Sequence, residues 1–344
     1  MFYLQNNPGR ICLINGKEFL FFSGYSYLGM SQLPEFIEMV KKGIDHYGVL
    51  FPSSRISNTR LKLFEDFENV LSELTSMEST VTFSSGYLSG QTIAAILSGY
   101  KNIFVAPNTH PAIKVKQSLG TEISDFTTWS NEVLKTINNS SDDEFVLISD
   151  SINIMQSVVY DFSFLEKIIT SKKIIFLIDD SHGVGILGNN GEGIISELPK
   201  KENIEYILSY SLSKALNING GAVSCSKYFA DLLRHHSNYT ASTSINPSLV
   251  FAFNNSQHLY SDQRKKLRQN ISLTNHMGEN LFHKNKSGLP ILISKKPVKE
   301  ALMKNDIIIS SFGYPTPQSK SIDRAIINAL HTTADVEKLL NTTD

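Results

Sequence analysis

The sequence predicts an α/β fold, in which helices cover a mostly parallel central sheet and a smaller α+β domain follows at the C-terminal end. Strand-like and helical segments alternate as far as about residue 225, and such alternation is typical of parallel sheets with covered faces. Residues 174–178 are continuously apolar, as expected for a strand buried on both faces. After Lys227 the pattern changes to a long, mostly polar helical stretch followed by short strands. We therefore predict an N-terminal segment, a large α/β domain and a small α+β domain, at 1–40, 41–235 and 236–344.

The first hundred residues predict two strands and three helices. A short strand at 18–22 precedes a helix that starts at Pro34, because proline is favoured at the first helical position. Apolar side chains at helical spacing predict an amphipathic helix over 63–74. A strand at 80–83 then leads through the turn 84–87 into a third helix. Small residues at such a turn leave backbone N–H groups free at a helix N-terminus, which favours an anion site there.

From residue 102 onward, strands and helices alternate. The predicted strands of the large domain lie at 102–106, 122–126, 145–149, 174–178, 206–209 and 221–225. Helical segments lie around 111–118, 130–138 and 162–170. In the small domain we predict strands near 289–294, 306–310 and 322–328, with a helix at 297–305. Open α/β sheets bind ligands outside the carboxyl ends of their strands, so residues directly after these strands are candidate site residues.

Composition and charge exclude several classes of function. The chain has 32 basic and 33 acidic residues and a net charge of -1, which argues against a nucleic-acid partner or a basic membrane surface. Its two cysteines, Cys12 and Cys225, are far apart and form no CxxC pattern, so we predict neither a disulfide framework nor a metal site. No apolar run reaches the roughly 20 residues of a membrane helix, and the N-terminus is unlike a signal peptide. We expect a cytoplasmic protein.

Three side chains of complementary chemistry follow two of the predicted strands. Asp179 and His182 come after the strand at 174–178, and Lys214 comes after the strand at 206–209. Pyridoxal 5'-phosphate needs a lysine for its Schiff base and an acid that keeps the pyridine nitrogen protonated, so that the ring acts as an electron sink. An amine, a carboxylate and an imidazole at one sheet edge therefore predict a site for pyridoxal phosphate.

Five segments occur in the same order as the motifs of a known enzyme family. They are Tyr27–Leu28–Gly29, Phe83–Ser84–Ser85–Gly86–Tyr87, Ile178–Asp179–Asp180–Ser181–His182–Gly183–Val184–Gly185, Tyr210–Ser211–Leu212–Ser213–Lys214–Ala215 and Ser242–Thr243–Ser244–Ile245–Asn246–Pro247. With these segments the chain resembles the α-oxoamine synthases, which include 8-amino-7-oxononanoate synthase and glycine C-acetyltransferase. The resemblance spans most of the chain and implies the fold of a fold type I PLP-dependent transferase.

The resemblance implies a role for each matching residue at the catalytic centre. Lys214 would bind the cofactor covalently and then act as the acid–base group at the substrate α-carbon. Asp179 would pair with the pyridinium nitrogen, and His182 would hydrogen-bond the ring hydroxyl. His110 matches the histidine that stacks on the cofactor ring.

The resemblance also implies which residues hold the phosphate and the substrate. The phosphate would be bound by Ser85, Gly86, Tyr87 and Ser211, with Thr243 and Ser244 reaching it from the neighbouring subunit of a homodimer. Arg324 matches the arginine that binds the amino-acid carboxylate, a task suited to a planar bidentate donor. Tyr25 also faces the substrate in this comparison. The implied reaction joins an amino acid to an acyl thioester and releases CO2, giving an α-oxoamine.

Several positions expected to face the substrate depart from the family pattern. Tyr25 replaces an asparagine, Leu50–Phe51–Pro52–Ser53 replaces a glycine-rich loop, and Phe64 replaces a histidine. Further along the chain, Asp150 replaces a glutamate, Ile154–Met155–Gln156–Ser157 replaces Ser-Met-Asp-Gly, and Ile322 replaces an arginine.

Three functions stay open on the sequence. The first is the α-oxoamine synthase reaction, which the retained Arg324 favours. The second is another pyridoxal-phosphate reaction on the same fold, either amino transfer or aldol cleavage, which the altered loop at 49–58 permits. The third is a protein that binds the cofactor without catalysis. The intact set of Lys214, Asp179 and His182 argues against the third function, because a reactive group of residues has no reason to persist in a scaffold.

Overall fold

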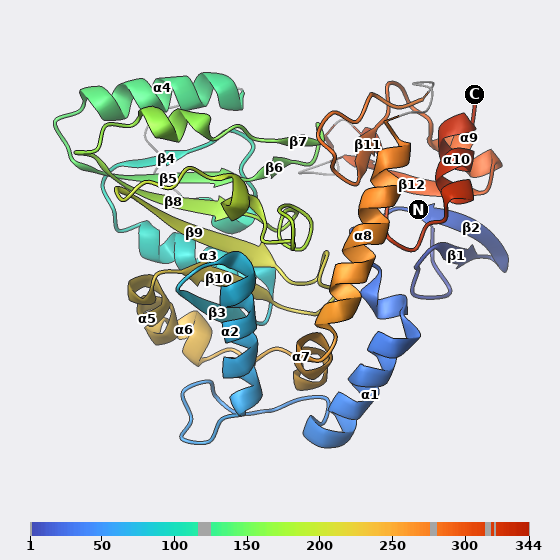
Figure 1. Cartoon of the computed structure of the whole chain (residues 1–344), viewed down its shortest axis with the longest axis horizontal. Coiled ribbons are helices and arrows are strands. Elements are labelled where there is room, and N and C mark those ends of the chain that lie inside the picture. Colours follow the sequence, from blue (N-terminus) through green and yellow to red (C-terminus); the bar gives the residue numbers. More distant parts are fainter. Residues whose placement is uncertain (1, 116–124, 276–280, 314–317, 320, 344) are drawn as a thin grey trace.

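A six-stranded sheet forms the centre of the large α/β part of the structure (Figure 1). The computed structural model describes residues 2–115, 125–275, 281–313, 318–319 and 321–343. In order across this sheet, the strands are β3 (Ser79–Phe83), β10 (Gly221–Cys225), β9 (Ile204–Ser211), β8 (Lys173–Asp179), β5 (Glu144–Asp150) and β4 (Ile103–Val105). β10 runs antiparallel to both of its neighbours, and the other adjacent pairs run parallel. The prediction of a mostly parallel sheet is confirmed.

Strand β8 shows why a continuously apolar run forms the middle of this sheet. Ile175 and Leu177 belong to the apolar cluster that contains α3 (Gly86–Leu97) and α5 (Lys227–His235). Phe176, between them in sequence, belongs to the core on the opposite face. Because successive strand side chains point to opposite faces, burial on both faces requires apolar residues at every position.

A second sheet is built from both ends of the described chain. Its order is β1 (Ile11–Ile14), β2 (Lys17–Phe22), β12 (Ile307–Gly313), β13 (Ser321–Ile326) and β11 (Ile291–Ile293). β2 pairs in parallel with β12, so the N-terminal hairpin extends the C-terminal sheet, as Figure 1 shows at the right. The domain bounds predicted above remain a prediction.

The remaining helices surround the two sheets. They are α1 (Pro34–Tyr47), α2 (Lys62–Thr75), α4 (Phe126–Asn139), α6 (Ser237–Thr240), α7 (Pro247–Asn254), α8 (Gln257–Leu273), α9 (Lys299–Lys304) and α10 (Thr333–Asn341). A two-stranded hairpin, β6 (Ile152–Asn153) with β7 (Val158–Val159), follows β5. No helix in the described ranges is long and apolar enough to cross a membrane.

Several local predictions differ from the structure. The segment predicted as a helix at 162–170 is a five-residue 3₁₀ helix over Ser163–Lys167. Most of the strand predicted at 122–126 and the end of the helix predicted at 111–118 lie outside the described residues, and Phe126 begins α4. The sequence pattern did not predict β1, the β6–β7 hairpin or α10. For α10 a signal existed, because Thr332 and Asp335 form a capping box at its start.

A buried histidine joins the N-terminal strands to the segment after β13. The ring of His331 stacks on Phe22, with 3.9 Å between ring centroids. Its Nδ1 accepts from the backbone N–H of Asn328 at 3.1 Å, and its Nε2 donates to the carbonyl of Phe21 at 3.1 Å. Burial lowers the pKa of His331 to about 4. The neutral ring is therefore part of the folded structure.

We expect this histidine to make folding sensitive to mild acid. The pKa of His331 is lower in the folded chain than the usual 6.5, so the unfolded chain binds the proton first as the pH falls. The contribution of the neutral imidazole to the free energy of unfolding is present above pH 6.5 and is lost as the pH falls from about 6.5 to 4. Between pH 7 and pH 5, wild type should lose about 2 kcal/mol more unfolding free energy than His331→Phe. Urea unfolding at both pH values measures this, and equal losses would contradict it.

Candidate functional site

The site forms where β5, β8 and β9 end. Asp150 and Asp179 are the last residues of two adjacent parallel strands and are paired in register. Lys214 follows the end of β9 after a short turn. The carboxyl ends of parallel strands meet at one edge of a sheet, and this edge is where ligands bind in such folds. The structure thus brings the predicted carboxylate and the predicted lysine together.

Lys214 lies at the end of a chain of hydrogen-bonding side chains. Its Nζ is 2.7 Å from Nε2 of His182, and Nδ1 of that imidazole is 2.8 Å from the hydroxyl of Tyr27. Burial lowers the pKa of Lys214, with the nearby Asp179 acting in the opposite direction. Burial also lowers the pKa of His182 well below its usual value, and the neighbouring amine of Lys214 adds to this. The site therefore favours a neutral imidazole beside an amine of weakened basicity.

His110 is held over the same strand ends by Asp150. Both carboxylate oxygens of Asp150 accept the backbone N–H of His110, at 3.0 and 3.2 Å. Nδ1 of the His110 ring lies 3.8 Å from Oδ2 of Asp179. Burial and the charge of Asp179 raise the pKa of Asp150 well above its usual value. From the sequence, Asp150 was only a departure from the glutamate of the family pattern. In the structure its carboxylate supports the loop that carries His110.

The second acid of the Asp179–Asp180 pair has a structural task. Asp180 is fully buried and accepts from the hydroxyl of Ser151 and the backbone N–H of Ile194, at 2.7 and 2.8 Å. A Cβ added at Gly183 would lie 1.9 Å from Oδ1 of Asp180, so only glycine fits there. Asp179 therefore remains the carboxylate available to a ligand.

The start of α3 forms an anion cradle. The side chain of Ser85 accepts from the backbone N–H of Leu88 at 3.1 Å and caps the helix. The N–H groups of Gly86 and Tyr87 belong to the first turn, where a helix offers no internal acceptor. A Cβ added at Gly86 would lie 2.7 Å from Cβ of Ser211, so glycine lets the helix start meet the end of β9. Free N–H groups and a serine hydroxyl at a helix N-terminus fit a phosphate.

Arg324 on β13 is a buried cation with spare donors. It is 1% exposed, and its Nε and Nη2 have no hydrogen-bond partner among the described residues. Its Nη1 contacts Sδ of Met155 at 3.1 Å, and its guanidinium lies 4.9 Å from the ring centre of Phe312. A buried guanidinium without an acceptor is costly, which indicates that an anion completes this pocket. Burial raises the pKa of Tyr25, and the positive charge of Arg324 opposes this shift. The ring of Tyr25 packs edge-on against His182, with 4.9 Å between ring centroids.

One cavity of about 460 Å³ joins the groups at the ends of β5, β8 and β9. Its lining includes the predicted residues His110, Asp179, His182 and Lys214, together with Asp150, Met155, Tyr160, Lys114 and Ile322. The other predicted site residues do not line it, namely Tyr25, Ser85, Gly86, Tyr87, Ser211, Thr243, Ser244 and Arg324. In the described part of the chain, no group of His, Cys, Asp and Glu side chains is arranged to hold a metal ion.

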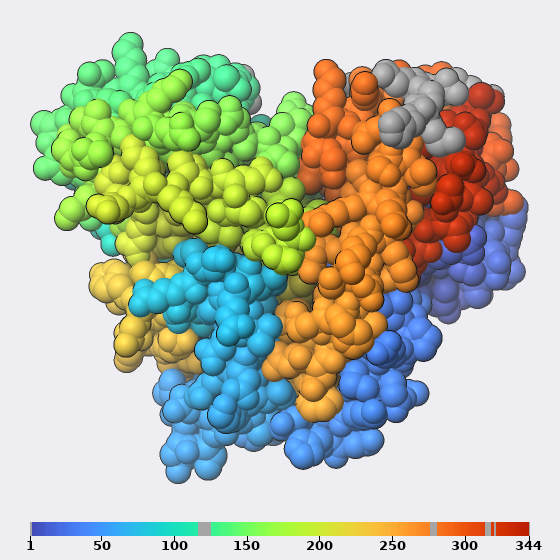
Figure 2. Space-filling model, in the orientation of Figure 1, coloured from blue at the N-terminus to red at the C-terminus, as the bar shows by residue number. Residues whose placement is uncertain are grey.

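A groove lined by residues of β7 and β11 adjoins this cavity, along the boundary between the green and the orange parts of the surface in Figure 2. It shares Met155 and Gln156 with the cavity. Its wall carries apolar side chains such as Leu187 and Ile291, and three basic side chains also line it, those of His283, Lys284 and Lys286. The groove thus offers an apolar path with basic groups toward the predicted site.

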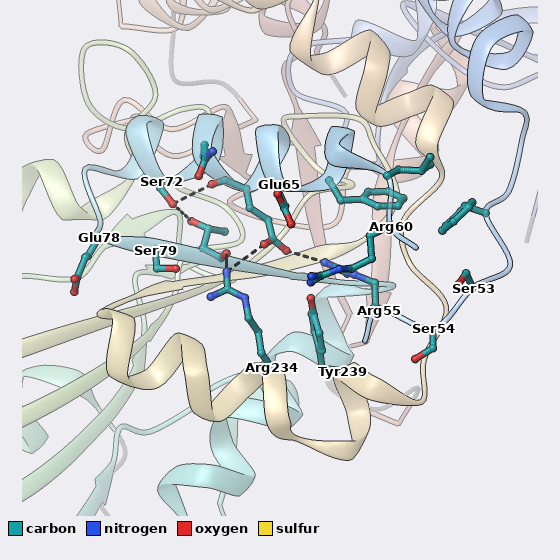
Figure 3. Close-up of a pocket in the computed structure, with 16 residues that line it drawn as sticks. Ser53, Ser54, Arg55, Arg60, Glu65, Ser72, Glu78, Ser79, Arg234 and Tyr239 are labelled. Atoms are coloured by element: carbon teal, nitrogen blue, oxygen red, sulfur yellow. Dashed lines mark hydrogen bonds and ion pairs between the residues drawn. The ribbon is translucent and has the colours of Figure 1, made fainter. Parts of the chain in front are cut away.

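A separate cavity of about 310 Å³ lies at the β3 edge of the sheet and shares no lining residue with the site (Figure 3). Arg55 donates to Glu68 at 2.9 Å and to the carbonyl of Thr82 at 3.0 Å. Glu68 accepts the backbone N–H of Thr82, and Arg234 donates to the carbonyl of Thr80. These charged side chains hydrogen-bond the backbone groups on the open side of β3, an edge strand, and thereby have a structural role. Two positions of family departure, Phe51 and Phe64, line this cavity.

Comparison with known proteins agrees with this geometry. Residues 17–342 match the family described as aminotransferase class I and II. A protein named 8-amino-7-oxononanoate synthase from Buchnera aphidicola is 26% identical over 98% of this chain and 91% of its own length.

Solved structures share the fold. A serine palmitoyltransferase from S. paucimobilis, solved with bound PLP and myriocin, matches with a TM-score of 0.84 at 18% identity, covering 99% of this chain and 91% of its own. An 8-amino-7-oxononanoate synthase from Francisella tularensis matches with a TM-score of 0.71 at 21% identity, covering 94% and 96%. The predicted fold type I architecture is confirmed. Because the family match extends over nearly all of its length, the chain belongs to the aminotransferase class I and II family.

Proposed function

We propose that this chain is a pyridoxal-phosphate-dependent acyltransferase of the α-oxoamine synthase type. It condenses an amino acid with an acyl thioester and releases CO2, in a reaction of the 8-amino-7-oxononanoate synthase type. The relatives that carry this name align over almost the whole chain. The main structural support is Arg324, a buried guanidinium whose Nε and Nη2 have no hydrogen-bond partner among the described residues and suit the carboxylate of an amino acid.

The cofactor is pyridoxal 5'-phosphate, and the residues present fit it. Gly86 and Ser211, at the anion cradle of α3, would hold the phosphate, and Asp179 would pair with the pyridine nitrogen. When bound, the ring supplies an electron sink for a carbanion at the substrate α-carbon. Lys214 provides the amine that binds the cofactor and then holds or returns the α-proton, and burial lowers the pKa of this amine, which favours its neutral form.

The groove between β7 and β11 is the proposed approach for the acyl donor. Apolar side chains such as Leu187 and Ile291 suit an acyl chain, and Lys284 and Lys286 suit the phosphates of its carrier. Met155 lies at the junction of the groove and the site cavity, in contact with Arg324. The thioester carbon can then reach the α-carbon of an amino acid held by that arginine.

We also propose a homodimer with shared active sites. Tyr87, in the phosphate cradle, is 57% exposed, so the cradle is open to a partner surface. Val49, Leu50 and Ile56 expose large apolar side chains on the loop that precedes α2. Thr243 is exposed, so its side chain is open to a partner subunit, whereas the hydroxyl of Ser244 is buried without a hydrogen-bond partner among the described residues.

Mixing two inactive variants tests the shared site. If each site uses Lys214 of one subunit and Thr243 of the other, Lys214→Ala and Thr243→Trp dimers are each inactive, but a hybrid dimer keeps one intact site. After subunit exchange of equal amounts, we expect about one quarter of wild-type activity, from the two-fold symmetry of the dimer. Sedimentation of each variant checks its assembly. No recovery with confirmed hybrid dimers would contradict the shared site.

Thiol release tests the reaction itself. The loaded protein is given glycine, alanine or serine together with acyl-CoAs of increasing chain length, and free thiol and CO2 are measured. We expect both products in equal amounts with one amino acid, and neither with Lys214→Ala. In a parallel arm, keto acids replace the acyl-CoA. If keto acids are aminated and no acyl-CoA releases thiol, the reaction is amino transfer and the acyltransferase proposal fails.

A further inference from the structure

Two chains of hydrogen bonds tie residues 26 and 27 to Lys214. In the first, Ser26 donates to the side-chain oxygen of Asn217 at 2.7 Å, and the amide of Asn217 donates to the carbonyl of Lys214 at 2.8 Å. In the second, the hydroxyl of Tyr27 meets Nδ1 of His182, whose Nε2 meets the amine of Lys214. The first chain fixes the lysine backbone, and the second reaches its reactive atom.

The second chain has only two self-consistent proton arrangements. Burial lowers the pKa of His182 well below its usual value, so the imidazole is neutral and carries one N–H. If the proton is on Nε2, the hydroxyl of Tyr27 donates to Nδ1 and the imidazole donates to Lys214. If the proton is on Nδ1, the hydroxyl accepts it and Lys214 donates to Nε2.

The surroundings of Tyr27 decide between these arrangements. The side chain is 0% exposed, and its hydroxyl has no hydrogen-bond partner other than His182 in the described part of the chain. Burial raises the pKa of Tyr27 well above 10, so the hydroxyl keeps its proton. If the hydroxyl only accepted, that proton would be buried without an acceptor, at a cost that favours the other arrangement. Donation from Tyr27 to Nδ1 gives that proton an acceptor, and the Nε2–H of His182 then donates to the neutral amine of Lys214.

We propose that Tyr27 is a positioning residue that fixes His182 in the Nε2–H tautomer, so that this imidazole presents a donor to Lys214 and to the cofactor oxygen that replaces it. The donor stabilises the neutral amine of Lys214, the form that reacts with an aldehyde. The part that concerns the cofactor rests on the proposed function, whereas the tautomer in the protein without cofactor does not.

The backbone of Tyr27 is held by parts of the chain far away in sequence. Its carbonyl accepts the N–H of Ala329, which follows β13, at 2.8 Å. The neighbouring carbonyl of Leu28 accepts from Gln263 of α8 at 2.8 Å. Ala329 follows β13, the strand that carries Arg324 and with it the proposed carboxylate site. The segment that holds the backbone of Tyr27 is therefore continuous with that strand. The position of Tyr27 therefore depends on the small sheet being in place.

Nitrogen NMR of the full chain without cofactor tests the tautomer. With ¹⁵N-labelled histidine, and His182→Gln to assign the signal among nine histidines, we expect Nε2 to be protonated and Nδ1 to show the shift of a hydrogen-bonded acceptor. In Tyr27→Phe, which keeps the ring, the Nδ1 shift should move to that of an unbonded nitrogen. Tyr206→Phe, which removes a distant hydroxyl bonded to the carbonyl of Pro199, and Ser26→Ala should leave both nitrogens unchanged.

The pKa of Lys214 gives a second readout. The charged and titratable groups facing its amine are Asp179, Asp150 and Asp180, which favour its protonation, and His182 and His110. All remain in Tyr27→Phe, but the imidazole becomes a weaker donor. We expect the pKa to rise by about half to one unit, seen as a shift in the pH dependence of the rate of pyridoxal-phosphate binding.

Protonation of Nδ1 in wild type, or an unchanged Nδ1 shift in Tyr27→Phe, would overturn the proposal. A Tyr27→Phe protein with altered far-ultraviolet circular dichroism is replaced by Tyr27→Leu, which also lacks a side-chain donor and is held to the same change in the Nδ1 shift. A protein that shows the expected tautomer but releases no thiol from any acyl-CoA would leave this inference standing while the proposed reaction fails.

Discussion

Replacing Lys214 by alanine is expected to lower turnover at least about 10³-fold while the chain remains folded. Lys214 is the amine nearest to Asp179 and His182 in the site cavity, and burial weakens its basicity so that it can attack an aldehyde. Its removal abolishes both the covalent attachment of the cofactor and proton transfer at the α-carbon. The α3 cradle remains, so non-covalent binding of pyridoxal phosphate should persist at lower affinity.

Lys114→Ala is the matched control for this variant. Lys114 lines the same cavity, but its side chain makes no hydrogen bond or ion pair within the described ranges. We expect this variant to attach the cofactor as wild type does, as seen in the visible absorbance band and in mass spectra after borohydride reduction. A Lys214→Ala protein that still gives a reduced adduct would show that another lysine binds the cofactor and would contradict the site described above.

Replacing Arg324 by methionine should separate binding from stability. Methionine keeps much of the side-chain volume but removes the guanidinium, whose Nε and Nη2 have no acceptor within the described structure. The amino-acid carboxylate then loses a buried charged partner, a loss of about 2–5 kcal/mol. We expect kcat/KM for the amino acid to fall about 10²- to 10³-fold, mainly through KM.

The same substitution should not destabilise the unloaded chain. A buried charge without an acceptor is unfavourable, and apolar replacement of buried charged groups is often neutral or stabilising. Thermal unfolding without ligands is therefore expected at the same or a higher temperature than in wild type. Arg324→Lys keeps the positive charge but loses the planar guanidinium, so its kcat/KM should lie between those of wild type and Arg324→Met. An unchanged KM for the amino acid, together with a lower melting temperature, would show that Arg324 is structural.

Much of the fold could be predicted because it depends on local pattern. The apolar run 174–178 requires a strand covered on both faces, and Pro34 with Gly48 marks the two ends of α1. The turn 84–87 predicted the start of α3 because capping and anion binding depend on residues close in sequence. Asp179 and Lys214 could be placed at one edge because the direction of parallel strands fixes where their ends meet.

The rest could not be predicted because it depends on contacts between distant segments. Tyr27 meets His182 across 155 positions, and Met155 meets Arg324 across 169. Hydrophobic periodicity carries no information on such pairs. β1 was missed for a similar reason, since a four-residue strand becomes recognisable only when β2 pairs with it and with β12.

Exchange of the amino-acid α-proton with solvent tests the central claim most directly, namely that Lys214, Asp179 and Arg324 form one pyridoxal-phosphate site that acts on the α-carbon. The loaded protein is incubated in D2O with glycine, alanine and serine, and loss of the α-proton signal is followed by NMR. We expect exchange of at least one amino acid in wild type, a strong reduction in Arg324→Met and none in Lys214→Ala. No exchange of any amino acid by a protein that binds the cofactor would contradict the account.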